Sequence, residues 1–124
     1  MSEAEIQRNV FKWFKAMWPN YEKSFQASMN GVNLGISRQA AIIRTNMKAQ
    51  GMCVGQSDIF LAIPRHGFHG KYIELKTLTG KPTQDQLEFI DVMVDQGYMA
   101  EICKGEQACK DAIESYIGYE YKLD

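Results

Sequence analysis

Two short segments, residues 55–61 and 73–77, constrain the fold of this chain more than any other part of its sequence. Each is predicted to form a strand, because residues 59–63 are all apolar and because apolar and charged side chains alternate in the second segment. Residues 64–70 begin with proline and contain two glycines, a composition that favours a turn. The sequence therefore predicts a hairpin that can bring the two strands side by side.

Charged residues of this predicted hairpin form a candidate metal site. Asp58 leads into the first strand, and Glu74 and Lys76 lie in the second. Alternate residues of a strand share a face, so Glu74 and Lys76 point the same way while Leu75 points into the core. Two carboxylates and a lysine on one face suit a magnesium site, to which the Leu75 carbonyl could add an oxygen ligand. The competing interpretation is an exposed, salt-bridged strand face, which is common in proteins.

Phosphodiester hydrolysis is the reaction that these groups could serve. The attacking water must lose a proton, negative charge on the phosphate must be neutralised, and the leaving oxygen must be stabilised. A divalent ion can assist all three steps when carboxylates hold it and leave positions open for water and phosphate. Lys76 could orient or deprotonate the water, or neutralise the phosphate.

The remaining chain is predicted to supply four helices and two further strands. Ser2, Ser37 and Thr83 are the expected N-caps of the first three helices. The helices are expected over residues 2–18, 38–50, 83–96 and 106–117, and the strands over residues 21–29 and 98–103. This order predicts an α/β fold with a small mixed sheet and helices on both faces. By length, residues 1–124 form a single domain.

Composition limits the class of protein. No apolar run approaches the roughly 20 residues of a membrane helix, and the N-terminus is acidic, unlike a signal peptide. The chain has three cysteines without metal-binding spacing, which indicates buried thiols in a reducing compartment; we expect Cys53 to be a small buried hydrophobe. These features favour a cytoplasmic protein without a membrane partner.

The net charge of −1 argues mildly against nucleic-acid binding, because proteins that bind phosphates are usually basic. A metal-dependent nuclease, however, concentrates acidic residues in its site. Arg38, Arg44 and Lys48 also gather basic charge on one predicted helix. A solvated helix face is one interpretation of these three residues. A DNA-facing edge that includes Asn30 of the preceding loop is the other.

Histidines and tryptophans are interpreted as structural. His66 and His69 have H-x-x-H spacing in the predicted hairpin loop, but two loop histidines without further ligands seldom bind zinc, so both are expected at the surface. Trp13 and Trp18 are expected to make core or dimer contacts rather than to stack on bases.

Several motifs, taken in order, resemble the VRR-NUC family of the PD-(D/E)XK nuclease superfamily. They are Glu3 to Gln7, Asn30-Gly31, Lys48-Ala49-Gln50-Gly51, Gly55-Gln56-Ser57-Asp58, Ile73-Glu74-Leu75-Lys76-Thr77 and Gln86. The resemblance extends from Glu3 to Tyr116, and the short stand-alone form is similar to those encoded by bacteriophages and prophages. It implies a restriction-endonuclease-like α/β core.

The resemblance also implies roles for individual residues. Asp58 and Glu74 would bind the metal, Mg²⁺ or Mn²⁺, and Lys76 would be the catalytic lysine. Glu3 would be the acid of the N-terminal helix that completes the metal site. Gln86 would be the catalytic-site polar residue of the helix after the strands.

Two positions qualify this comparison. Glu5 is an alternative to Glu3 as the helix acid, although Glu3 stands four residues before Gln7, as in the family pattern. The family usually has proline before the aspartate, whereas this chain has Ser57. Serine lacks the rigidity of proline, but the aspartate is kept, so we expect little effect on chemistry.

The function implied is a metal-dependent, structure-selective DNA endonuclease. The short family members resemble Holliday-junction resolvases that act as homodimers on branched DNA, and a two-fold dimer would suit symmetrical cutting of two strands. One alternative is a monomeric flap or nicking endonuclease. Another is a non-catalytic DNA-binding or phage structural module with the same fold.

Overall fold

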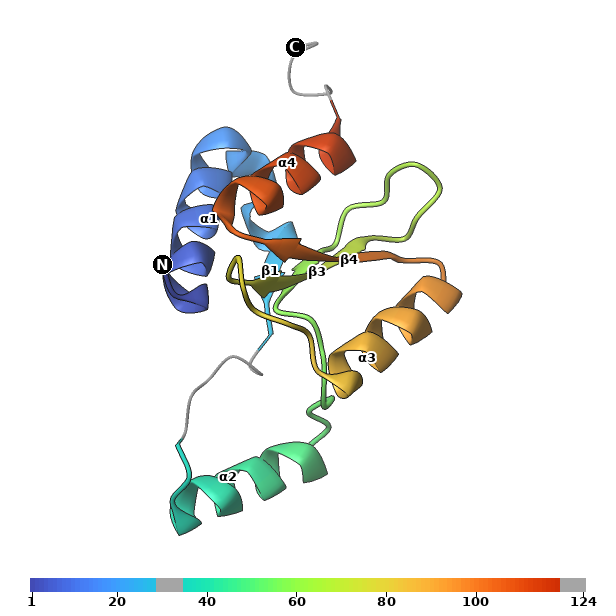
Figure 1. Ribbon diagram of the computed structural model, residues 1–124. Helices are drawn as coiled ribbons and strands as arrows, with labels where there is room; N and C mark the ends of the chain where they lie inside the picture. The colour runs from blue at the N-terminus through green and yellow to red at the C-terminus, as the bar shows by residue number, and fades with distance from the viewer. Residues whose placement is uncertain (29–34, 119–124) are drawn as a thin grey trace.

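A four-stranded mixed sheet forms the centre of the structure, a computed structural model that describes residues 1–28 and 35–118. The strands are β1 (Phe25–Ala27), β2 (Ile59–Leu61), β3 (Lys71–Lys76) and β4 (Met99–Lys104), in the spatial order β1-β2-β3-β4. Strand β2 is antiparallel to both of its neighbours, β1 and β3, whereas β3 and β4 are parallel. The predicted α/β fold with a small mixed sheet and a central hairpin is confirmed (Figure 1).

The described residues contain four α-helices: α1 (Glu3–Met17), α2 (Arg38–Ala49), α3 (Gln84–Asp95) and α4 (Glu106–Ile117). The predicted N-caps are confirmed, because the side chains of Ser2, Ser37 and Thr83 each accept a hydrogen bond from a backbone N–H of the first turn. Across the described residues, no helix combines the length and the apolar character that a membrane crossing requires.

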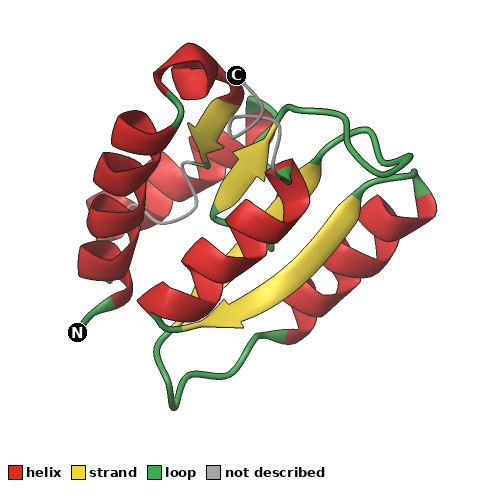
Figure 2. Cartoon of the chain, turned by 90° about the horizontal axis from the view of Figure 1, so that it is seen from above, coloured by secondary structure: helices red, strands yellow, loops and turns green. Residues whose placement is uncertain are grey.

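Helices cover both faces of the sheet (Figures 1 and 2). Helices α1 and α4 pack on the face of β3 that carries Ile73 and Leu75, and the core there includes Phe14 and Ile113, all fully buried. Burying each of these side chains contributes about 1.5–3 kcal/mol. Helix α3 lies against the opposite face, while α2 stands apart from the sheet in Figure 1.

Aromatic side chains form the packing on the α3 face. Tyr72 of β3 stacks on Phe60 of β2, with ring centroids 4.3 Å apart, and meets Phe89 of α3 edge-on at 5.1 Å. Because side chains alternate along β3, Glu74 and Lys76 lie on this same face. The face that carries the candidate site is therefore the one that α3 covers.

The strand predicted over residues 21–29 is wrong in its first half. Residues Pro19–Ser24 form a 3₁₀ helix, η1, and only Phe25–Ala27 pair with β2. Pro19 stands at the first position of η1, where its fixed φ favours a helical turn. Apolar content alone did not distinguish this turn from a strand. Met29 lies outside the described residues.

Predictions for the cysteines, tryptophans and histidines are mostly confirmed. Cys103 and Cys109 are buried, but Cys53 is exposed, because it lies in the loop between α2 and β2 that runs over the surface. Trp18 is a core residue and meets Trp13 edge-on, with ring centroids 5.3 Å apart. Both loop histidines of the hairpin are exposed.

Candidate active site

Asp58 lies directly before β2, at the point where the pairing of β2 with β3 ends. The last paired residues there are Ile59 and Ile73, so the next part of β3 is not paired with β2. The backbone N–H of Leu75 donates instead to Asp58 Oδ2 at 2.7 Å. On the other side, the N–H of Ser28 donates to the Asp58 carbonyl at 2.8 Å. Asp58 is thus held between the two strands: β1 binds its backbone carbonyl and β3 binds its carboxylate.

The loop before Asp58 is held against α3 by a close backbone approach. Gly55 has a φ of +81°, and a Cβ at this position would lie 2.3 Å from the carbonyl oxygen of Asp85. Only glycine satisfies both the positive φ and this contact. The loop can therefore approach the first turn of α3 and deliver Asp58 to the end of the central strands.

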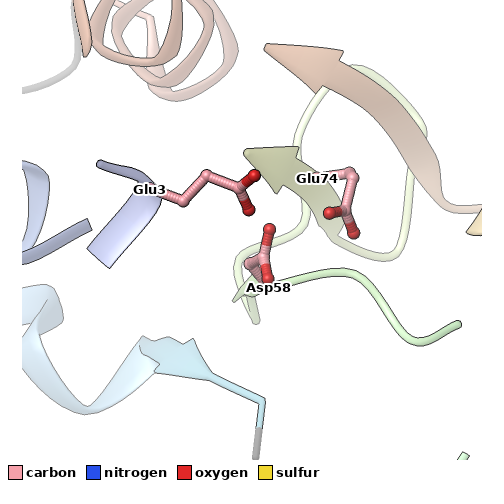
Figure 3. Close-up of side chains that lie close together, drawn as sticks. All are labelled: Glu3, Asp58 and Glu74. Atoms are coloured by element: carbon pink, nitrogen blue, oxygen red, sulfur yellow. The ribbon is translucent and has the colours of Figure 1, made fainter. Parts of the chain in front are cut away.

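Glu3, not Glu5, lies in the acidic cluster. The side chain of Glu5 forms a capping box with Ser2, whose Oγ donates to Glu5 Oε1 at 3.1 Å and accepts from the Glu5 N–H at 3.2 Å. This hydrogen bonding lowers the pKa of Glu5. Glu3 remains exposed, and its carboxylate points toward the sheet (Figure 3).

Carboxylates from three elements meet at one place. Oxygen atoms of Glu3, Asp58 and Glu74 all lie within 4.8 Å of one another (Figure 3). They come from the first turn of α1, the entry to β2 and the middle of β3. Folding is required to bring these residues together, since Glu3 and Asp58 lie 55 positions apart in the sequence.

Glu74 is the buried member of this cluster, with only 1% of its surface exposed. Desolvation and the adjacent negative charge of Asp58 raise the pKa of Glu74 to about 8, against a smaller opposing effect of Lys76. Glu74 Oε1 is buried and has no hydrogen-bond partner among the described residues. A buried carboxylate oxygen without a partner is costly, so a group that supplies positive charge would fit here.

Two side chains bind the other oxygen of Glu74. Lys76 Nζ lies 3.4 Å from Glu74 Oε2, and Gln86 Nε2 donates to the same oxygen at 3.1 Å. Lys76 is 7% exposed, so its ammonium is largely withdrawn from water. The backbone N–H of Thr83 donates to Gln86 Oε1 at 2.8 Å, which completes the capping box of α3 and fixes the amide.

The cluster suits a hard divalent cation. Its donors are carboxylate oxygens, which Mg²⁺ and Mn²⁺ prefer, and one side of the cluster is exposed at Glu3. The unpartnered oxygen of Glu74 is the feature that a cation would satisfy. The backbone N–H of Leu75 donates to Asp58. That the Leu75 carbonyl is a further metal ligand stays a prediction.

The predicted DNA-binding residues lie elsewhere. Arg38, Arg44 and Lys48 are all on α2, and Arg44 Nη1 donates to the Gly35 carbonyl at 2.7 Å. None of the three belongs to the acidic cluster. Their role in DNA binding stays a prediction, and Asn30 lies outside the described residues.

Ser57 and Gln7 were named from the sequence, but the burial of Ser57 and the position of Phe11 beside the cluster were not predicted. Ser57 is 2% exposed, and its Oγ has no hydrogen-bond partner within residues 1–28 and 35–118. A cavity beside the cluster is lined by Glu3, Asp58, Gln7, Phe11 and other residues. The spacing of Glu3, Gln7 and Phe11, each four residues from the next, could have indicated this shared helix face.

The fold and the site together define a class of protein. The sheet is mixed and has helices on both faces. Three carboxylates and a buried lysine lie at one end of its central strands. This arrangement is consistent with a restriction-endonuclease-like core. The VRR-NUC domain matches residues 1–107, and the chain belongs to the VRR-NUC domain family. This membership supports a nuclease function.

A solved structure of a VRR_NUC domain protein is also similar to this chain. That protein is 26% identical in sequence and superposes with a TM-score of 0.77, over 94% of this chain and 88% of that chain. No curated protein matches the chain. The restriction-endonuclease-like α/β fold implied by the sequence motifs is therefore shown by a structural neighbour as well.

Proposed function

We propose that this protein is a metal-dependent, structure-selective DNA endonuclease that hydrolyses phosphodiester bonds, resolving Holliday junctions as a homodimer. The observation that carries the proposal is the meeting of Glu3, Asp58 and Glu74 within 4.8 Å, with one buried oxygen of Glu74 left without a partner. Family membership supports the nuclease part of the proposal.

Glu3, Asp58 and Glu74 would hold Mg²⁺ or Mn²⁺. When bound, such an ion neutralises charge that develops on the phosphate and lowers the pKa of water. The chain's own groups prepare the site: the Leu75 N–H fixes Asp58, and Gln86 fixes Glu74. These contacts hold the carboxylates in place before the substrate arrives.

Lys76 would act on the attacking water and on the phosphate. Its ammonium lies 3.4 Å from Glu74 Oε2 and is little exposed, so its field is weakly screened. In hydrolysis a bond forms between the water oxygen and phosphorus, and the ester P–O bond breaks. Lys76 would orient that water or stabilise a phosphate oxygen. The attacking water releases one proton to the solvent, and the leaving oxygen takes up one proton.

A non-catalytic module is less consistent with these residues. Burying a carboxylate next to a second one is unfavourable, as the raised pKa of Glu74 reflects. A scaffold gains nothing from this arrangement, whereas a metal site requires it. For a Holliday junction, two such sites related by a two-fold axis would cut opposite strands, which supports a dimer as the active form.

Cleavage of labelled DNA tests the proposal. Four-way junction, flap and linear duplex of related sequence would be incubated with Mg²⁺ or Mn²⁺ and wild-type protein, Lys76→Ala or Lys104→Ala. Lys104 is the matched control, because it pairs with Lys76 across β3 and β4 but is exposed. Light scattering would report the oligomeric state in the same buffer.

We expect symmetrical, metal-dependent cutting of the junction by a dimer. Lys76→Ala should abolish it and Lys104→Ala should not. Preferred cleavage of the flap by a monomer would replace the resolvase with a flap endonuclease. Absence of cleavage on every substrate, from folded protein with either metal, would contradict the nuclease proposal.

A further inference from the structure

A cavity of about 390 Å³ adjoins the acidic cluster on the side of α1 and β1. Glu3 and Asp58 form one wall of it, so the cavity and the candidate metal site share two residues. The other walls come from one face of α1 and from the end of β1. Its size falls within the range of small-molecule sites, and it could hold the sugar and base of one nucleotide.

The walls of the cavity differ chemically. Phe11 provides an aromatic surface; its ring packs against Phe25 with centroids 4.2 Å apart and is only partly buried. Arg8 provides an exposed positive charge and makes no hydrogen bond or ion pair with any described residue. A cation beside an aromatic ring is the combination that binds a phosphate and the base attached to it.

The end of β1 adds space and hydrogen-bonding groups. Ala27 and Ser28 line the cavity there, and Gln7 faces it from α1. Ser28 Oγ has no hydrogen-bond partner within the described part of the chain, whereas its N–H is engaged by Asp58. Alanine at position 27 leaves room that a larger side chain would fill.

We propose that this cavity binds one unpaired nucleotide next to the phosphate that is cleaved, with the base against Phe11 and a neighbouring phosphate against Arg8. A base held here cannot stack within a duplex at the same time. Nucleotides at a branch or a strand end unstack at lower cost than paired ones, so the cavity would select branched DNA. This subsite rests on the proposed nuclease function and adds to it the feature of DNA that is recognised, an unpaired nucleotide.

Binding rather than cleavage tests the subsite. A fluorescent duplex with a short single-stranded overhang and a blunt duplex of the same sequence would be titrated with protein in Ca²⁺, in place of Mg²⁺, at several salt concentrations. The variants are Arg8→Gln, Phe11→Leu and Ala27→Leu. Lys12→Gln is the matched control, because it removes the same charge from the exposed side of α1 outside the cavity.

We expect wild-type protein to prefer the overhang by about tenfold, the size of one base–aromatic stacking contact. Phe11→Leu, which keeps an apolar residue against Phe25, and Ala27→Leu, which fills the cavity, should abolish this preference. Arg8→Gln should reduce the slope of log affinity against log salt by about one, as loss of one phosphate contact does. Lys12→Gln should change neither quantity.

Equal binding of overhang and blunt duplex by wild-type protein would overturn the subsite. The subsite would also be overturned if folded Phe11→Leu and Ala27→Leu kept the preference for the overhang and Arg8→Gln kept the wild-type salt slope. Because the assay does not depend on catalysis, a protein that shows the preference but cuts no DNA would retain the subsite and lose the nuclease function. A protein that cuts DNA but binds overhang and blunt duplex equally would retain the nuclease function and lose the subsite.

Discussion

Gln86 connects Glu74 to the start of α3. Its Nε2 donates to Glu74 Oε2 at 3.1 Å, and its Oε1 accepts from the Thr83 N–H at 2.8 Å. One side chain thus caps a helix and restrains the buried carboxylate of the candidate metal site. Disturbing either contact should affect both the helix and the site.

Replacing Gln86 with alanine should lower stability by about 1 kcal/mol, because a capping contact and the hydrogen bond to a carboxylate are both lost. Gln86 also holds the Glu74 carboxylate in place, so its loss should weaken Mn²⁺ binding. Gln84→Ala is the control, since Gln84 lies in the same turn, is exposed and donates a hydrogen bond to Glu88 at the surface. Equal effects of the two variants on Mn²⁺ affinity, by calorimetry, would mean that Gln86 does not position the site.

Stability without metal should fall as pH rises. The folded-state pKa of Glu74 is about 8, above its ordinary value of 4.5, so the folded protein binds this proton more tightly than the unfolded chain. The stabilisation is present below pH 4.5 and is lost as pH rises through 8. Over this window we expect a loss on the order of a few kcal/mol.

Urea denaturation at a series of pH values measures this effect. Glu74→Gln carries no titrating group at this position, so its stability should change less with pH than that of the wild type. Glu88→Gln, an exposed position on α3, should retain the wild-type dependence. Identical pH dependence of wild type and Glu74→Gln would contradict the assignment of the raised pKa to Glu74.

Gly55→Ala should destabilise the protein and displace Asp58. An added Cβ would lie 2.3 Å from the Asp85 carbonyl, where only backbone could move, in addition to the strain of a positive φ. We expect a loss of at least about 2 kcal/mol. Gly67→Ala is the control, because Gly67 has a similar φ of +83° and open space around it.

Thermal denaturation of these two alanine variants separates contact from strain. Gly67→Ala carries the strain alone, so the difference between the variants reports the contact of Gly55 with α3. A smaller loss of thermal stability in Gly55→Ala than in Gly67→Ala would contradict the close approach of Gly55 to the Asp85 carbonyl.

Ser57→Ala should be neutral or stabilising. Its hydroxyl is buried without a partner among the described residues, and removing an unsatisfied polar group relieves a desolvation cost of about 1–3 kcal/mol. Thr at this position keeps the hydroxyl and adds a methyl group, so Ser57→Thr is the comparison. Clear destabilisation by Ser57→Ala would indicate that the hydroxyl is bonded in solution.

The strands and helices were predictable because local patterns determine them. Alternation around Ile73 and Leu75 gave β3, and the caps at Ser2, Ser37 and Thr83 gave the starts of three helices. The turn of η1 was not predictable from apolar content, since Pro19 decides it by backbone geometry. The exposure of Cys53 depends on the path of a loop, which the sequence does not encode locally.

The site was partly predictable for a similar reason. Glu74 and Lys76 share a strand face because side chains alternate along a strand. The position of Asp58 beside them follows from the pairing of β2 with β3 in the hairpin. The near approach of Glu3 depends on how α1 packs on the sheet, so only the family resemblance indicated it. The burial of Glu74 and the cavity at Phe11 arise from tertiary packing and became visible only in the structure.

The most direct measurement is calorimetric titration of the protein with Mn²⁺ at pH 8, for wild type, Asp58→Asn and Glu5→Gln. Asp58 belongs to the acidic cluster, whereas Glu5 is also a carboxylate residue but is engaged in capping α1. We predict saturable binding by the wild type, its loss in Asp58→Asn, and its retention in Glu5→Gln. Equal Mn²⁺ binding by all three proteins, or none by the folded wild type, would contradict the metal site at Glu3, Asp58 and Glu74.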